Sequence, residues 1–119
     1  MENKRKIGTT YENRAAAYLQ EQGFVIVEQN FFCRNGEIDI IAKDGTYLVF
    51  IEVKYRRDHT CGSPLEAVNA KKQKRICRTA FYYCSIHGYG DWTPCRFDVI
   101  AVEGDGTIVH IKNAFEFKM

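Results

Sequence analysis

Residues 36–56 alternate apolar and charged side chains in a way that is typical of a β-hairpin. Asp44-Gly45 predicts its two-residue turn, because glycine accepts a positive φ and aspartate tolerates the left-handed region. Counting back from this turn gives the expected cross-strand pairs, which are Lys43 with Thr46, Asp39 with Phe50 and Glu37 with Glu52. The pattern therefore predicts antiparallel strands at about 37–42 and 47–55.

The two faces of this hairpin differ in composition, since successive side chains of a strand point to opposite sides. The first face is apolar or aromatic throughout and collects Ile38, Ile40, Ala42, Tyr47, Val49, Ile51, Val53 and Tyr55. The second face is apolar near the turn and charged at the far end, and collects Glu37, Asp39, Ile41, Leu48, Phe50, Glu52 and Lys54. Because both faces carry large apolar residues, we expect the sheet to be covered on both sides.

Three carboxylates, of Glu37, Asp39 and Glu52, meet at the charged end of the second face. Opposed like charges destabilise a sheet, and partial burial increases the cost. Two interpretations are open. Lys54 together with a divalent cation such as Mg²⁺ could neutralise the carboxylates, because Mg²⁺ prefers oxygen ligands. Alternatively, the charged end protrudes into solvent as an ion-paired edge of the sheet.

The rest of the chain predicts two helices and three more strands. Two capping boxes mark the helix starts, Thr9 to Glu12 before a helix at about 10–22 and Ser63 to Glu66 before a helix to about Ile86. The strands are expected at about 24–27, 96–102 and 108–111. The element order α-β-β-β-α-β-β predicts an α/β fold, with a mixed sheet and a long helix crossing between two of its strands.

Glu12 has two candidate roles. As the last residue of its capping box it would only satisfy backbone amides at the helix start. It also shares a helical stripe with Ala15, Ala16 and Leu19, which turns it toward the core side. In that second role Glu12 would point a further carboxylate at the sheet.

Length and composition fit one globular domain spanning residues 1–119, with 45% hydrophobic and 27% charged residues. No apolar run approaches the roughly 20 residues that a membrane helix needs. The basic start at residues 4–6 precedes polar residues, unlike a secretory signal. We therefore expect a cytoplasmic protein without membrane association.

The five cysteines are expected to be free thiols. Their number is odd and none forms a C-x-x-C pair, which argues against a disulfide framework. Together with the three histidines they lack the close spacing of structural zinc ligands, so zinc is not expected.

Positive charge is concentrated beside the carboxylates, although the net charge is only +2. The basic residues expected to bind the backbone of a nucleic acid are Arg56, Arg57, Lys71, Lys72, Lys74 and Arg75. A solvated helix face is the commoner explanation for a run of lysines, and it stays open here.

The combination of acids, lysine and basic surface favours metal-assisted hydrolysis of a phosphodiester. A cation held by Asp39 and Glu52, with Glu12 helping through water, would polarise a phosphoryl oxygen. Lys54 could orient water or stabilise charge that develops on the phosphate. Glycoside cleavage by the carboxylates is less favoured, because it needs an open sugar cleft, and no histidine signature supports a cysteine nucleophile.

Several short motifs in this order resemble the YraN-like family of small bacterial proteins over nearly the whole chain. They are Glu12, Gly36-Glu37-Ile38-Asp39, Phe50-Ile51-Glu52-Val53-Lys54, Lys72-Gln73-Lys74-Arg75-Ile76 and Arg96-Phe97-Asp98. The family is placed in the restriction-endonuclease-like PD-(D/E)xK superfamily and is similar in its core to Holliday junction resolvases. The resemblance implies a restriction-endonuclease-like core that binds Mg²⁺ or Mn²⁺.

The resemblance also implies roles for single residues. Asp39 and Glu52 would be metal ligands, Lys54 the catalytic lysine and Glu12 the acid carried by the helix. It favours Asp39 over Glu37, which the face count leaves equal. Ile38 stands where the superfamily carries proline, and Tyr11 where glycine is expected. Lys72 and Asp98 also match family positions, but no role follows from that match. Glu37, Arg96 and Asp98 are candidates for a supporting role around the site. Asp98 is expected to pair with Arg96 or Lys54, either as such a supporting group or in a purely structural salt bridge, and both interpretations stay open.

These observations lead to three functional hypotheses. The first is a metal-dependent DNA endonuclease that acts on branched or recombination intermediates, as a homodimer suited to cutting two strands and with a targeting protein partner. The second is a non-catalytic nucleic-acid-binding or adaptor module that keeps the nuclease fold. The third is a protein-interaction module without nucleic-acid affinity.

Overall fold

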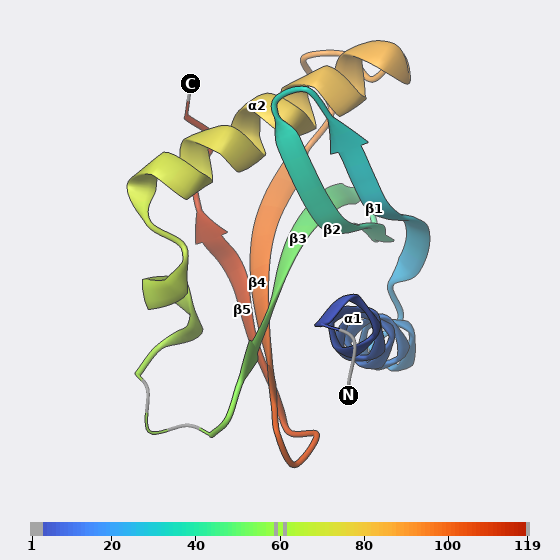
Figure 1. Ribbon diagram of the computed structural model, residues 1–119. Coiled ribbons are helices and arrows are strands. Elements are labelled where there is room, and N and C mark those ends of the chain that lie inside the picture. The colour runs from blue at the N-terminus through green and yellow to red at the C-terminus, as the bar shows by residue number, and fades with distance from the viewer. Residues whose placement is uncertain (1–3, 59, 61, 119) are drawn as a thin grey trace.

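The computed structural model describes residues 4–58, 60 and 62–118, and the side chains from Thr10 onward. The elements, in chain order, are helix α1 (Lys4–Glu21), strands β1 (Val25–Cys33), β2 (Gly36–Asp44) and β3 (Tyr47–Arg56), the short 3₁₀ helix η2 (Pro64–Ala67), helix α2 (Ala70–Ile86), and strands β4 (Cys95–Glu103) and β5 (Ile108–Phe115) (Figure 1). The expected order α-β-β-β-α-β-β is confirmed.

The strands lie in the sheet in the order in which they follow along the chain, β1-β2-β3-β4-β5. β3 and β4 are parallel, whereas the other neighbouring pairs are antiparallel. A parallel pair needs a long crossover, and α2 lies within it, as expected. The result is a mixed sheet in an α/β fold.

Each face of the sheet has its own core, as the two-sided hydrophobic pattern predicted. α1 packs on one face through Ala15, Ala16 and Leu19, which contact side chains of β2, β3 and β4. α2 packs on the other face through residues such as Ile76 and Tyr83. Each face of the sheet is therefore covered by one of the two long helices.

The β2–β3 turn differs from the prediction by one residue on each strand. Asp44 pairs with Tyr47, so the turn consists of Gly45 and Thr46, and Gly45 has the positive φ of 60°. Asp44 stays in the strand because its Oδ2 accepts a hydrogen bond from Arg96 Nη1 at 3.0 Å. A shift of one residue on both strands does not by itself move a side chain to the other face of the sheet.

Ile38 is an exception to the predicted faces. It packs on the α2 side together with Ile41, not with Ile40 on the α1 side. The ladder between β2 and β3 ends at the pair of Ile40 and Ile51, so the first part of β2 is free to turn away from β3. On the neighbouring strand, Asn30 adopts a positive φ of 56°, which marks the same irregularity.

Both predicted helix starts are wrong. α1 begins at Lys4, so residue 9 lies within the helix and cannot cap it. Ser63 does act as a cap, but for η2, and α2 has a separate cap in Asn69, whose side chain accepts from the Lys72 amide at 2.9 Å. β1 and β5 also extend further than the alternation predicted, to Cys33 and Phe115.

Candidate active site

Asp39 lies where β2 and β3 separate. Its Oδ2 accepts a hydrogen bond from the Val53 backbone amide at 2.7 Å, beyond the last paired residues of the two strands. A buried amide needs an acceptor, and here a side chain supplies it in place of the neighbouring strand. The separation of the strands thus fixes a carboxylate at the open end of the β2–β3 ladder.

Two further carboxylates lie beside Asp39. One oxygen each of Glu12, Glu37 and Asp39 can be chosen so that all three lie within 4.8 Å of one another. Glu12 comes from the interior of α1, because that helix begins two turns earlier than expected. Glu12 therefore has no capping role at the helix start, and its carboxylate reaches the acidic end of the sheet.

Burial raises the pKa values of two of these carboxylates, Asp39 and Glu12. Burial, then the charge of Glu52, raise the pKa of Asp39 to about 8, against the lowering effect of the Val53 amide. Burial also raises the pKa of Glu12, although hydrogen bonds with Asn30 and Asp39 oppose the shift. Without a compensating cation, the cluster accordingly retains a proton near neutral pH.

Glu52 lies next to the cluster and is paired with two lysines. Lys72 Nζ lies 2.8 Å and Lys54 Nζ 3.3 Å from Glu52 Oε1, and Glu52 is only 8% exposed. Burial, then the neighbouring Lys72, lower the pKa of Lys54. Burial alone would lower the pKa of Lys72, but its bonds with Glu52 and Lys54 raise it instead. Lys72 is thus part of this cluster and is not merely a solvated residue of α2.

The donor set suits a hard divalent cation. The clustered atoms of Glu12, Glu37 and Asp39 are all carboxylate oxygens, which Mg²⁺ and Mn²⁺ prefer over nitrogen and sulfur. Glu52 is near enough for its charge to act on Asp39, yet its carboxylate bonds to lysines. The residues present therefore fit a metal centred on Asp39, with Glu37 closer to it than the sequence indicated.

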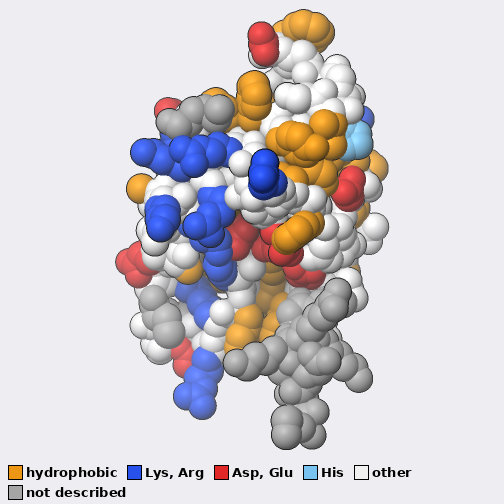
Figure 2. All heavy atoms as spheres, turned by 45° about the horizontal axis from the view of Figure 1, so that its top comes forward, with side chains coloured by type: hydrophobic (Ala, Val, Ile, Leu, Met, Phe, Trp, Pro, Cys, Tyr) orange, Lys and Arg blue, Asp and Glu red, His pale blue; other side chains and the backbone are white. Residues whose placement is uncertain are grey.

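The expected basic surface divides into three parts. Arg56 is held by Glu103, with Nη2 2.9 Å from Oε2, and by the Gly62 carbonyl oxygen, so its guanidinium is already engaged. Lys72 points into the acidic cluster. The residues left exposed are Arg57, Lys71, Lys74 and Arg75. In Figure 2, basic side chains gather on one side of the face that presents α2, with acidic side chains beside them near its centre.

Arg96 and Asp98 belong to a different network. Asp98 is fully buried and accepts bonds from Arg96 Nε at 2.9 Å and from the Asn113 amide at 3.0 Å, with His110 Nε2 at 2.7 Å. These hydrogen bonds outweigh burial and hold the pKa of Asp98 below its ordinary value. Tyr18 Oη completes the network at 3.0 Å from His110 Nδ1. Asp98 thus pairs with Arg96, one of its two expected partners, and Lys54 with Glu52.

Two sequence signals were too weak to reveal this arrangement. His110 lies in an edge strand, and its partner Tyr18 is 92 residues away in the chain. Lys72 is one of several basic residues in a row, and these residues differ only in the side of the helix from which each side chain projects. Only the packing of α2 against the sheet distinguishes Lys72 from its neighbours.

The fold and the cluster together define a small α/β protein with a carboxylate–lysine site at one end of a mixed sheet. The chain belongs to the family described as "Uncharacterised protein family UPF0102", the YraN family, whose model matches residues 11–102. It is 49% identical to a UPF0102 protein of Lachnoclostridium phytofermentans over 96% of both chains. A UPF0102 protein of Coxiella burnetii is 43% identical over 94% of this chain and 93% of its own. These matches confirm the family resemblance. Within the described residues, no helix is long and apolar enough to cross a membrane.

Proposed function

We propose that this protein is a metal-dependent endonuclease that hydrolyses phosphodiester bonds in DNA. The observation that carries the proposal is the position of Asp39, which is held at the open end of the β2–β3 ladder among other carboxylates. Glu52 and Lys54 follow on the adjoining strand, and the exposed basic residues of α2 lie nearby. Carboxylates, a lysine and a basic surface are the groups that phosphodiester hydrolysis requires.

Asp39, Glu12 and Glu52 would hold Mg²⁺ or Mn²⁺, with Glu37 as a further oxygen donor. When bound, the ion supplies Lewis acidity to the phosphate and to water. The carboxylates repel phosphate when no cation is present, so activity should depend strictly on the metal. The hydrogen bond from Val53 orients Asp39 whether or not a metal is bound.

Lys54 and the surface of α2 would act on the substrate. Lys54 Nζ is partly buried beside Glu52, where its charge can stabilise a phosphate more strongly than in bulk water. Lys71, Lys74 and Arg75 are exposed and can contact the DNA backbone without sequence preference. Branched DNA is the proposed substrate because of the family's similarity to Holliday junction resolvases, and a homodimer would present two such sites.

A gel assay tests the proposal. End-labelled four-way junction, single-stranded and linear duplex DNA are incubated with Mn²⁺, Mg²⁺ or EDTA, using the wild type, Glu52→Ala and the control Glu21→Ala, which alters an exposed acid of α1. We expect metal-dependent cleavage that is lost only in Glu52→Ala, with DNA binding retained or strengthened because an anionic group is gone. Equal cleavage by Glu52→Ala would refute the assignment of the site.

An adaptor that binds nucleic acid without cutting it is the second candidate. The double pairing of Glu52 with Lys54 and Lys72 favours it, because these lysines already neutralise part of the cluster. Titration calorimetry with Mg²⁺ and Mn²⁺ separates the two functions. Metal binding, in the presence or absence of DNA, supports the nuclease, whereas its absence in a folded protein supports the adaptor.

A further inference from the structure

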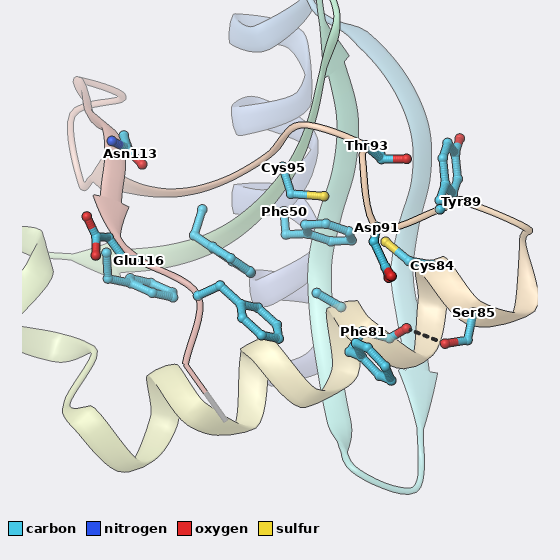
Figure 3. Close-up of a pocket in the computed structure, with 15 residues that line it drawn as sticks. Phe50, Phe81, Cys84, Ser85, Tyr89, Asp91, Thr93, Cys95, Asn113 and Glu116 are labelled. Carbon is cyan, nitrogen blue, oxygen red and sulfur yellow. Dashed lines mark hydrogen bonds between the residues drawn. The ribbon is translucent and has the colours of Figure 1, made fainter.

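A cavity of about 490 Å³ opens on the α2 side of the sheet. It lies between the second half of α2, the segment 89–95 and the end of β5 (Figure 3). None of the residues that line it belongs to the carboxylate–lysine site. Its volume falls in the range of sites that bind small organic molecules.

One wall of the cavity is a stack of aromatic rings. The ring of Phe97 lies 5.7 Å from Phe50, 5.1 Å from Phe115 and 6.4 Å from Phe117, measured between centroids, with interplanar angles of 27°, 18° and 26°. Phe50, Phe97 and Phe115 are also buried members of the core between α2 and the sheet. This wall is therefore held in place by the fold itself, whether or not a ligand is present.

The wall that α2 contributes combines three small side chains with the ring of Phe81. Ala80, Cys84 and Ser85 face the cavity from α2, at a spacing that puts them on one side of the helix. Figure 3 shows Cys84 and Ser85 on this helix, and Cys95 on the strand across from it. Small side chains on this wall leave a space that the stacked rings do not fill.

The charged side chains that line the cavity, among the described residues, are all acidic. Asp91 and Glu116 contribute two exposed carboxylates, which lie on different sides of the cavity (Figure 3). Among the described residues that line the cavity, none is Lys, Arg or His. The walls therefore combine aromatic faces, which attract cations through their quadrupole, with negative charge at the rim.

We infer that this cavity binds a small organic cation, an amine that is protonated or quaternary and carries an aromatic or aliphatic body. The apolar body would be buried against Phe97 and Phe115. The cationic group would lie at the rim, where the negative field of Asp91 on one side and Glu116 on the other stabilises it. An anion of the same shape would meet two like charges and no compensating base. This inference is independent of the proposed nuclease activity.

Nuclear magnetic resonance titration of the ¹⁵N-labelled full chain tests the inference with three probes of similar size. They are benzyltrimethylammonium, benzyl alcohol and phenylacetate, which are cationic, neutral and anionic. We expect saturable shifts with benzyltrimethylammonium at the amides of Phe81, Ser85 and Phe117, with weaker binding of benzyl alcohol and none of phenylacetate. Equal or tighter binding of the neutral or anionic probe overturns the inference, as does the absence of shifts at these amides.

Matched variants locate the binding. Asp91→Asn and Glu116→Gln should each weaken benzyltrimethylammonium binding by roughly two- to fivefold, the size expected of an exposed charge pair. Ser85→Trp places a large ring at the mouth of the cavity and should abolish binding. Glu21→Gln removes an exposed acid outside the cavity and should change nothing. Unchanged affinity in both acid variants, or in a folded Ser85→Trp protein, would overturn the assignment.

Discussion

The carboxylate of Asp39 and the backbone amide of Val53 are joined by a 2.7 Å hydrogen bond at the point where β2 leaves β3. This bond takes the place of a backbone hydrogen bond between β2 and β3, because the ladder of the two strands has already ended. It fixes Asp39 among other acids, where burial and Glu52 raise its pKa to about 8. Asp39 thus accepts the hydrogen bond of the Val53 amide at the end of the ladder and also supplies the central carboxylate of the candidate site.

This raised pKa makes the metal-free protein less stable as the pH rises. The pKa of Asp39 changes from 3.8 in its ordinary state to about 8 in the fold, so the folded protein binds more protons than the unfolded chain between these values. The free energy of unfolding should therefore fall from about pH 4 to about pH 8, and then level off, by a few kcal/mol in order of magnitude. Urea denaturation in EDTA across this range measures the slope.

The variant Asp39→Asn tests whether Asp39 causes this slope of the free energy of unfolding against pH. Its side-chain oxygen can still accept from Val53, but it cannot ionise. We expect a flatter pH dependence and a protein more stable than the wild type above pH 8, whereas the exposed-acid control Glu21→Gln should follow the wild type. A slope unchanged in Asp39→Asn would mean that another group takes up the proton.

Lys72 should compete with metal for Glu52. Its Nζ lies 2.8 Å from Glu52 Oε1, so a cation bound at the cluster must share or displace this contact. We expect Lys72→Met to bind Mn²⁺ roughly three- to tenfold more tightly in calorimetry, the effect of removing one nearby positive charge at about 1 kcal/mol. Lys71→Met is the control, because Lys71 is exposed on the same helix. Weaker Mn²⁺ binding in Lys72→Met would show that the lysine supports the metal site.

The hydrophobic pattern predicted most of the hairpin that carries the site. Alternation assigned Ile40, Ile51 and Phe50 to their observed faces, because a period of two residues is preserved wherever a ladder is regular. It failed at Ile38, where the ladder with β3 has ended and β2 is paired only with β1. The turn was misplaced for a different reason, since the bond from Arg96 to Asp44 comes from a strand far along the chain.

Asp98→Asn should destabilise the fold without affecting metal binding. The Asp98 side chain is fully buried between Arg96 and His110. Removing its charge leaves the Arg96 guanidinium with Asp44 as its one ionic partner among the described residues. We expect a loss of about 3 kcal/mol in urea denaturation, typical of breaking a buried ion pair. Asp44→Asn should cost less, because Asp44 is partly exposed.

Calorimetry with Mn²⁺ provides the other half of this test. An unchanged Mn²⁺ affinity in folded Asp98→Asn would show that the network of Arg96 and Asp98 is structural. A reduced affinity would instead connect the network to the carboxylate–lysine site.

Cys95 should react with thiol reagents before Cys84 and Cys77. A hydrogen bond from Cys84 lowers the pKa of Cys95, which is exposed, while the same bond and burial raise the pKa of Cys84. Burial also raises the pKa of Cys77. Because the thiolate is the reactive form, mass spectrometry after brief treatment with iodoacetamide should find alkylation at Cys95 first. Cys84→Ala removes the donor and should slow that reaction, and an unchanged rate would contradict the role of the hydrogen bond.

The acids of the site could be read from the sequence more fully than its lysines. Glu37, Asp39 and Glu52 interrupt apolar strands, so their charges stand out against the alternation. Lys72 does not stand out, since it is one of several basic residues of α2 and its direction depends on how the helix packs. For the same reason, the pairing of Arg96 with Asp98 was open until β4 was placed beside β3.

The strands lie in the sheet in the order in which the ribosome synthesises them. The parts of the candidate site therefore become available one after another during synthesis. β1, β2 and β3 join through short turns, which close quickly. By the time Arg56 has emerged, the chain contains all four carboxylates and Lys54, but not Lys72. Among the strand pairings of the described residues, that of β4 with β3 closes the longest segment, residues 57–94. The carboxylates therefore assemble first, and the docking of α2 that completes the second core also delivers Lys72, the second of the two lysines that pair with Glu52.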